Sequence, residues 1–171
     1  MRLQTLAAVV LLALSVCPSF AQTTRPADLR QEIAAGWMPD PTLTPGDSFP
    51  GVTADTVSAP GYATSTRAVS KSEKDKVFAE YGITTRAPRE YEIDHLIPLE
   101  LGGSNDITNL WPQPYHGAWN AHVKDALEDR LRALVVARKV ALDEAQKEIA
   151  TDWITAYKKH VDAAGADPGG G

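Results

Sequence analysis

The second half of the chain carries hydrophobic residues at the spacing of two amphipathic helices. From Trp119 to about Val140, apolar residues stand at positions 123, 127, 131, 134 and 135. From roughly Asp143 to Val161, a single stripe contains Ala145, Ile149, Trp153 and Tyr157. Because residues three or four apart share one face of a helix, each segment has one apolar face to bury. We expect the two helices to form an antiparallel pair that supplies most of the core.

A shorter helix is predicted at "SKSEKDKVFAEYG", residues 70–82. Ser70 and Glu73 have the spacing of a capping box, in which each side chain bonds to the backbone of the other residue. Gly82 is expected to end this helix, because glycine readily takes the left-handed conformation that follows a last helical turn.

The segment "YEIDHLIPLELGGSNDITNLW", residues 91–111, has a different pattern. It predicts a strand, a turn at Gly102 and Gly103, and a loop that returns through "NDITNLW". The apolar residues around the turn predict burial, so the polar pair Asp94 and His95 needs a separate explanation.

The flanking regions have no helical period. Residues 22–67 are rich in Pro, Thr, Gly and Asp, which favour turns. Their scattered large apolar residues predict an irregular arm that packs over the core, and these are Trp37, Met38, Leu43, Phe49, Val52 and Val57. We expect the folded domain at 68–163 and a flexible, glycine-rich tail at 164–171.

The first 21 residues have the features of a signal peptide. Arg2 precedes an apolar run from Leu6 to Val16, and small residues before and at Ala21 suit a signal peptidase. We therefore expect an exported protein, periplasmic or extracellular, of which 150 of the 171 residues remain. Cys17 leaves with the leader, so no disulfide is expected. No later segment is long and apolar enough to span a membrane, so we expect no stable membrane association, and a monomer by default.

Charge narrows the set of partners. Loss of Arg2 leaves 16 of the 17 basic residues against 22 acidic ones, a net charge of about −6. This balance argues against a tight nucleic-acid binder, because such binding depends largely on Lys and Arg. It leaves room for an enzyme that contacts its polymer through a local basic patch.

Asp94 and His95 combine two useful chemistries. A neutral imidazole can take a proton from water near neutral pH, and a carboxylate is a hard oxygen ligand suited to Mg²⁺ or Mn²⁺. Adjacent residues of a regular strand point to opposite faces, so both can serve one site only where the strand ends, twists or bulges. Asn109, fourteen residues after His95, can pin the loop by bonding to its backbone.

The first turn of the next predicted helix adds polar residues that can bind a cation, namely Asn120, His122 and Asp125. Strand, loop and helix are therefore expected to converge on one metal ion.

These residues carry a resemblance to a known family. The motif Asp-His, then Pro98, then Gly-Gly-Ser-Asn-Asp, then Asn-Leu resembles the core of the HNH endonucleases, the ββα-metal nucleases. Residues 40–160 also resemble exported bacterial HNH-like proteins, with "PGYATSTR", "NLWPQPY" and "AHVKDALE" as further shared segments. The resemblance implies an α+β fold: a hairpin-plus-helix core, with the C-terminal helical pair and the N-terminal arm added to it.

The resemblance also implies roles. His95 would activate water for attack on a phosphodiester, Asp94 would bind the metal, and Asn109 would orient the base. The family often has a further ligand three residues before a lysine of the last helix, but here that position is Ala121. His122 is the favoured substitute and Asn120 the alternative. Glu92 would hydrogen-bond a metal-bound water.

The expected function is hydrolysis of DNA with little sequence specificity, with RNA as the alternative polymer and one divalent ion as cofactor. Mg²⁺ or Mn²⁺ is favoured over Zn²⁺ or Ni²⁺. Lys124, Arg67 and Arg130 are the candidates for phosphate contacts. The alternative hypothesis is a noncatalytic exported module that binds metal or nucleic acid on the same scaffold.

Overall fold

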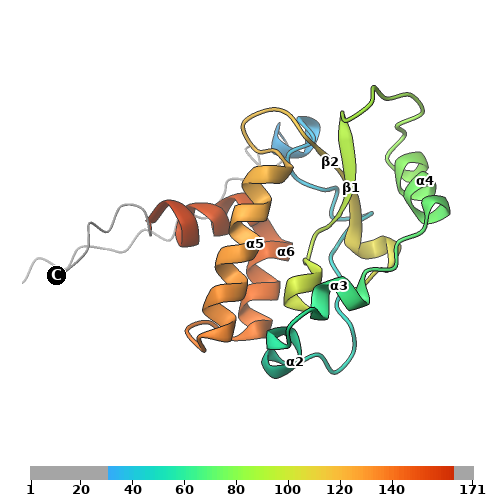
Figure 1. The fold of residues 1–171 in the computed structure, drawn as a ribbon. Helices are drawn as coiled ribbons and strands as arrows, with labels where there is room; N and C mark the ends of the chain where they lie inside the picture. Colours follow the sequence, from blue (N-terminus) through green and yellow to red (C-terminus); the bar gives the residue numbers. More distant parts are fainter. Residues whose placement is uncertain (1–30, 164–171) are drawn as a thin grey trace, which may run out of the picture.

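The structure is a computed structural model that describes residues 31–163 as a mixed α+β fold (Figure 1). The predicted signal peptide at 1–21, the first residues of the arm at 22–30 and the predicted tail at 164–171 lie outside the described residues. Among the helices of residues 31–163, none has the length and apolar character needed to cross a membrane.

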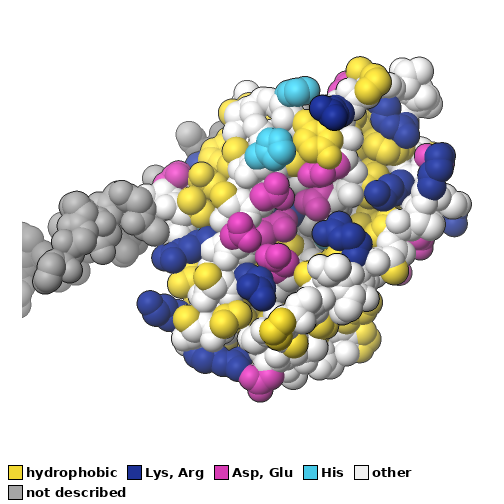
Figure 2. Space-filling model, viewed as in Figure 1, with side chains coloured by type: hydrophobic (Ala, Val, Ile, Leu, Met, Phe, Trp, Pro, Cys, Tyr) yellow, Lys and Arg dark blue, Asp and Glu magenta, His cyan; other side chains and the backbone are white. Residues whose placement is uncertain are grey.

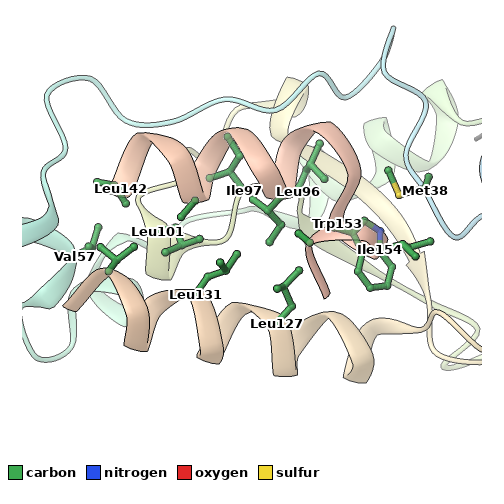
Figure 3. Packing of buried hydrophobic residues seen from close by; sticks show 14 of the residues in the cluster. Met38, Val57, Leu96, Ile97, Leu101, Leu127, Leu131, Leu142, Trp153 and Ile154 are labelled. Carbon is green, nitrogen blue, oxygen red and sulfur yellow. The ribbon is translucent and has the colours of Figure 1, made fainter. Parts of the chain in front are cut away.

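The predicted helical pair is present and lies side by side with its chain directions opposed (Figure 1). Helix α5 covers Ala121–Val136, and α6 covers Leu142–Tyr157 before it continues into a π-helical turn, η3, at Lys158–Asp162. Figure 3 shows Leu127 and Leu131 of α5 pointing toward α6, and both are fully buried. Ala145, Ile149 and Trp153 of the predicted stripe are also fully buried, which confirms the helical period as the source of this core layer.

Helix α5 is shorter than predicted at both ends. It begins after Asn120, whose side-chain oxygen accepts a hydrogen bond from the Val123 backbone nitrogen. It ends at Val136 because Arg138 takes a positive φ of 58°, a conformation that a right-handed helix does not contain.

The predicted strand and returning loop form a two-stranded antiparallel hairpin. Strand β1 covers Tyr91–His95 and β2 covers Leu110–Pro114, with His95 opposite Leu110. The connection contains two 3₁₀ turns, η1 at Leu99–Leu101 and η2 at Ile107–Asn109.

Gly103 explains how this connection folds back. A Cβ atom at that position would lie 1.7 Å from the carbonyl oxygen of Ile97, so any side chain would force the two segments apart. Gly102 beside it has a φ of 79°, which favours glycine. The predicted turn is therefore a close backbone crossing.

Helix α4, Lys71–Glu80, confirms the predicted capping box: Ser70 Oγ accepts from the Glu73 backbone nitrogen and Glu73 Oε2 accepts from that of Ser70. Val77 and Phe78 are buried where α4 packs against β2.

The described part of the arm packs on the core as predicted, but it is less irregular. Two five-residue helices are present, α2 at Ala54–Ser58 and α3 at Tyr62–Thr66. Sequence periodicity did not reveal them because five residues make little more than one helical turn. Met38 and Val57 join the main core, and a β-bridge between Ser48 and Gly103 fixes the arm to the hairpin loop.

Candidate functional site

A polar cavity of about 290 Å³ lies where α3, the loop after β1 and α5 meet. It is lined by Asp94 and His95 together with residues of those elements, namely Ala63, Thr64, Arg67, Pro98, Leu99, Glu100, Asp125, Glu128 and Asp129. Figure 2 shows acidic side chains gathered over this face, with Lys and Arg side chains beside them. Asp94 and His95 can share the cavity because β1 ends at His95, where the chain leaves the regular strand.

His95 is only 3% exposed, although it lines the cavity. Its Nε2 lies 3.1 Å from the side-chain oxygen of Asn105. Burial lowers the pKa of His95 below its ordinary value and outweighs the hydrogen bond to Asn105 and the charge of Asp94, which act to raise it. The ring is therefore neutral at pH 7, which is the state in which imidazole can accept a proton.

Asn109 holds the loop that follows His95, as the sequence predicted. Its fully buried amide donates to the carbonyl oxygens of Ile97 and Ser104, at 2.9 Å each. Its oxygen accepts from the backbone nitrogens of Ile97 at 2.9 Å and Asp47 at 3.2 Å. The amide thus joins two parts of the hairpin loop and the arm, and a role of Asn109 in catalysis stays a prediction.

Lys124 was predicted to contact phosphate, and the structure does not support that interpretation. Its side chain is 0% exposed. The ammonium donates to Asp94 Oδ2 at 2.8 Å, to the carbonyl oxygen of His95 at 2.6 Å, and to Glu128 Oε1. Burial by itself would lower the pKa of Lys124, but the charges of Asp94 and Glu128 raise it above the ordinary value. Lys124 is therefore a buried cation that ties β1 to α5.

The structure adds acidic residues that sequence reasoning did not select. Glu128 and Asp129 of α5 and Glu100 of η1 line the cavity beside Asp125. Burial raises the pKa of Glu100, Asp125 and Glu128, and in each case the charge of a neighbouring carboxylate adds to the effect. The i, i+4 spacing of Asp125 and Asp129 was the available signal, because it places both on one helix face. This side of the cavity favours bound cations.

Asn120 and His122 are not brought to the cavity. The amide of Asn120 caps α5 and also donates to the carbonyl oxygen of Gly117 at 2.9 Å. The side chain of His122 is 75% exposed, with its ring 5.9 Å from that of Tyr115. Its Nδ1 lies 3.7 Å from Oδ2 of Asp125, which lines the cavity, but neither His122 nor Asn120 is itself a lining residue, so neither predicted third ligand is in place.

Of the three remaining predicted site residues, one lines the cavity and two do not. Arg67 lines the cavity. Arg130 points elsewhere, since its Nε donates to the carbonyl oxygen of His160 at 3.1 Å. Glu92 accepts a hydrogen bond from the Tyr115 hydroxyl at 2.7 Å, and burial raises the pKa of Glu92. Glu92 is not among the residues that line the cavity.

The cavity offers a metal ion carboxylate donors from several elements. Within residues 31–163, no three His, Cys, Asp or Glu side chains stand together as a ready-made metal group. Mg²⁺, however, usually keeps several waters and takes only one or two carboxylates from the protein. Asp94 on a polar, acidic cavity satisfies that smaller requirement.

Three comparisons bear on the identity of the chain. No protein-family model, no curated protein and no solved structure matches it. No family is therefore assigned to it. Asp94, His95 and Arg67 line one cavity, and Asn109 holds the loop that follows His95.

Proposed function

We propose that the protein is an exported, metal-dependent endonuclease of the HNH type that hydrolyses DNA with little sequence specificity. The observation that carries the proposal is that Asp94 and a neutral His95 line the same polar cavity. The sequence motif around the pair supports it, as does Lys124 of α5, whose ammonium bonds to Asp94 and to the carbonyl oxygen of His95 at the end of β1.

In this proposal His95 is the general base. Its neutral ring accepts a proton from a water molecule as the water oxygen attacks phosphorus and the bond to the leaving 3′ oxygen breaks. The leaving oxygen takes its proton from solvent. General-base catalysis of this kind contributes about 10²–10⁴-fold to a rate.

Asp94 would hold a divalent ion, chiefly Mg²⁺ or Mn²⁺, through one carboxylate and retained waters. Such an ion supplies positive charge to the phosphate and to the developing negative charge of the leaving group. Arg67, which also lines the cavity, would bind a phosphate oxygen, since its guanidinium matches phosphate geometry.

One observation favours the alternative, a noncatalytic module that binds metal or nucleic acid. Lys124 donates to both Asp94 and Glu128, so the carboxylate assigned to the metal already has a cation at 2.8 Å. A scaffold in which this ion pair replaced the metal would keep its fold and lose hydrolysis.

Plasmid nicking by the purified protein tests the two candidates. The wild type is assayed with Mg²⁺ and with Mn²⁺, with EDTA as the blank. His95→Ala is compared with His116→Ala, which changes an exposed histidine outside the cavity. Circular dichroism establishes that both variants are folded.

The endonuclease proposal expects nicking by the wild type and by His116→Ala, and loss of nicking with EDTA and in folded His95→Ala. Equal cleavage by His95→Ala would remove His95 as the base. Absence of cleavage with either ion would favour the binding module. Binding of labelled DNA would then be measured on the same samples.

A further inference from the structure

Asn105 occupies a junction that the sequence did not single out. It lies in the hairpin loop between Gly103 and Asn109, and its side chain reaches two other segments. The side-chain oxygen lies 3.1 Å from His95 Nε2 and accepts from the Ala68 backbone nitrogen at 3.4 Å. The side-chain nitrogen donates to the carbonyl oxygen of Thr66 at 2.7 Å.

These contacts determine which way the amide faces. A carbonyl oxygen can only accept a hydrogen bond, so the group facing Thr66 must be the NH₂. A backbone N–H can only donate, so the group facing Ala68 must be the oxygen. Rotation of the amide by 180° would bring two acceptors together at Thr66 and two donors together at Ala68. The oxygen of Asn105 therefore faces His95.

The orientation of Asn105 determines in turn where His95 carries its proton. An amide oxygen only accepts, so Nε2 of a neutral His95 must be the protonated nitrogen. Nδ1 is then the nitrogen with a free lone pair, and no hydrogen-bond partner for Nδ1 is present among residues 31–163. The proposed general base is therefore Nδ1 of His95, a residue that lines the cavity.

Thr66 and Ala68 are the residues on either side of Arg67. By bonding to both, the Asn105 side chain holds the backbone that carries Arg67, which lines the cavity with His95. The Asn105 side chain thus contacts both the backbone that carries Arg67 and the ring nitrogen of His95. Among the described hydrogen bonds, Asn105 provides the link between residues 66–68 and His95.

We propose that Asn105 is a positioning residue. It keeps His95 in the form protonated at Nε2, and it holds the backbone of Arg67 in place beside the same cavity. The consequence for cleavage rests on the proposed nuclease function, whereas the protonation of His95 does not. The two can therefore be tested apart.

The first measurement is nuclear magnetic resonance of the histidine side chains at pH 8, where a histidine is neutral. Couplings between ring protons and ring nitrogens identify the protonated nitrogen, and the spectrum of His95→Ala assigns the signals of His95. Asn105→Ala removes the acceptor, Asn105→Asp keeps it, and Asp106→Asn changes the exposed neighbouring residue as a matched control.

We expect wild type, Asn105→Asp and Asp106→Asn to carry a proton on His95 Nε2 that exchanges slowly with water. In Asn105→Ala we expect that proton to exchange at least about tenfold faster, because its buried partner is gone. A proton on Nδ1 in the wild type, or unchanged exchange in folded Asn105→Ala, would overturn the proposal.

The second measurement is the rate of plasmid cleavage by the same variants. Asn105→Ala should lose about tenfold or more in kcat/KM, yet less than the 10²–10⁴-fold expected for loss of the base itself. Asn105→Asp should recover part of that loss. If the wild type cuts no DNA while the slow Nε2 proton is observed, the nuclease function fails and the role of Asn105 stands. If the wild type cuts DNA and Asn105→Ala cuts equally well, the positioning role fails and the nuclease stands.

Discussion

Replacement of Lys124 by methionine tests the buried ion pair at the base of the cavity. Methionine keeps most of the apolar stem and removes the ammonium with its three hydrogen bonds, to Asp94, Glu128 and the carbonyl of His95. Removing one partner of a buried ion pair costs about 3–5 kcal/mol, because the other charge stays behind without compensation.

The structure favours the lower end of that range, about 3 kcal/mol. The side chains of Asp94 and Glu128 are 20% and 14% exposed, so each regains some contact with water when Lys124 is removed. Burial already raises the pKa of Glu128, so this carboxyl can also take up a proton once the ammonium is gone. Since domains of this size have free energies of unfolding of about 5–15 kcal/mol, the variant should still fold.

Urea denaturation of wild type, Lys124→Met and the exposed-residue control Lys139→Met measures the effect. Lys139→Met should stay within about 0.5 kcal/mol of wild type. Because Lys124 lowers the pKa of Glu128, that pKa rises further in folded Lys124→Met, and Glu128 binds a proton there more tightly than in the wild type. Lowering the pH from 7 to 5 should therefore narrow the gap between variant and wild type, by at most about 1.4 kcal/mol per pH unit for each proton.

A loss below about 1 kcal/mol at pH 7 would refute this reasoning, because that is the range of an exposed ion pair. Lys124 would then reach solvent, and its predicted contact with phosphate would become admissible again.

Further predictions concern the base, the helix and the leader. Because burial lowers the pKa of His95, kcat/KM for DNA should stay constant as the pH falls from 7 toward 6.5, the approximate pKa of an ordinary histidine, and should decline only below that pH. A decline that begins above pH 7 would contradict a neutral, buried His95 as the base. The unfolded chain binds a proton at His95 more readily than the folded one, so the contribution of His95 to stability should also diminish as pH falls below about 6.5, as urea midpoints would show. His122→Ala should leave metal-dependent cleavage within about twofold of wild type, since its side chain is 75% exposed and outside the cavity; a loss comparable to that of His95→Ala would restore it as a ligand. If the protein is exported by its leader, mass spectrometry of the protein recovered outside the cytoplasm of an expressing bacterium should give a chain that begins at Gln22, and an uncleaved amino terminus would remove the signal-peptide assignment.

The sequence by itself determined the elements that have a clear period or a specific end signal. The apolar stripes of α5 and α6 predicted a packed pair, and the Ser70–Glu73 capping box predicted the start of α4. The motif from Asp94 to Asn109 located the hairpin and selected His95 and Asn109, whose types and spacing are informative without coordinates. These features are local, so the sequence contains them directly.

Tertiary structure decided which side chains meet. Lys124 and His122 stand two residues apart on α5, yet one is fully buried against Asp94 and the other faces solvent. Their exposure depends on the rotation of α5 relative to β1, which no local pattern specifies. Asn105 is part of the Gly-Gly-Ser-Asn-Asp motif, but it has no assigned role until Thr66, Ala68 and His95 are brought around it from two other segments. A side chain whose partners lie ten to forty residues away acquires its role only when the packing of distant elements fixes those partners in place.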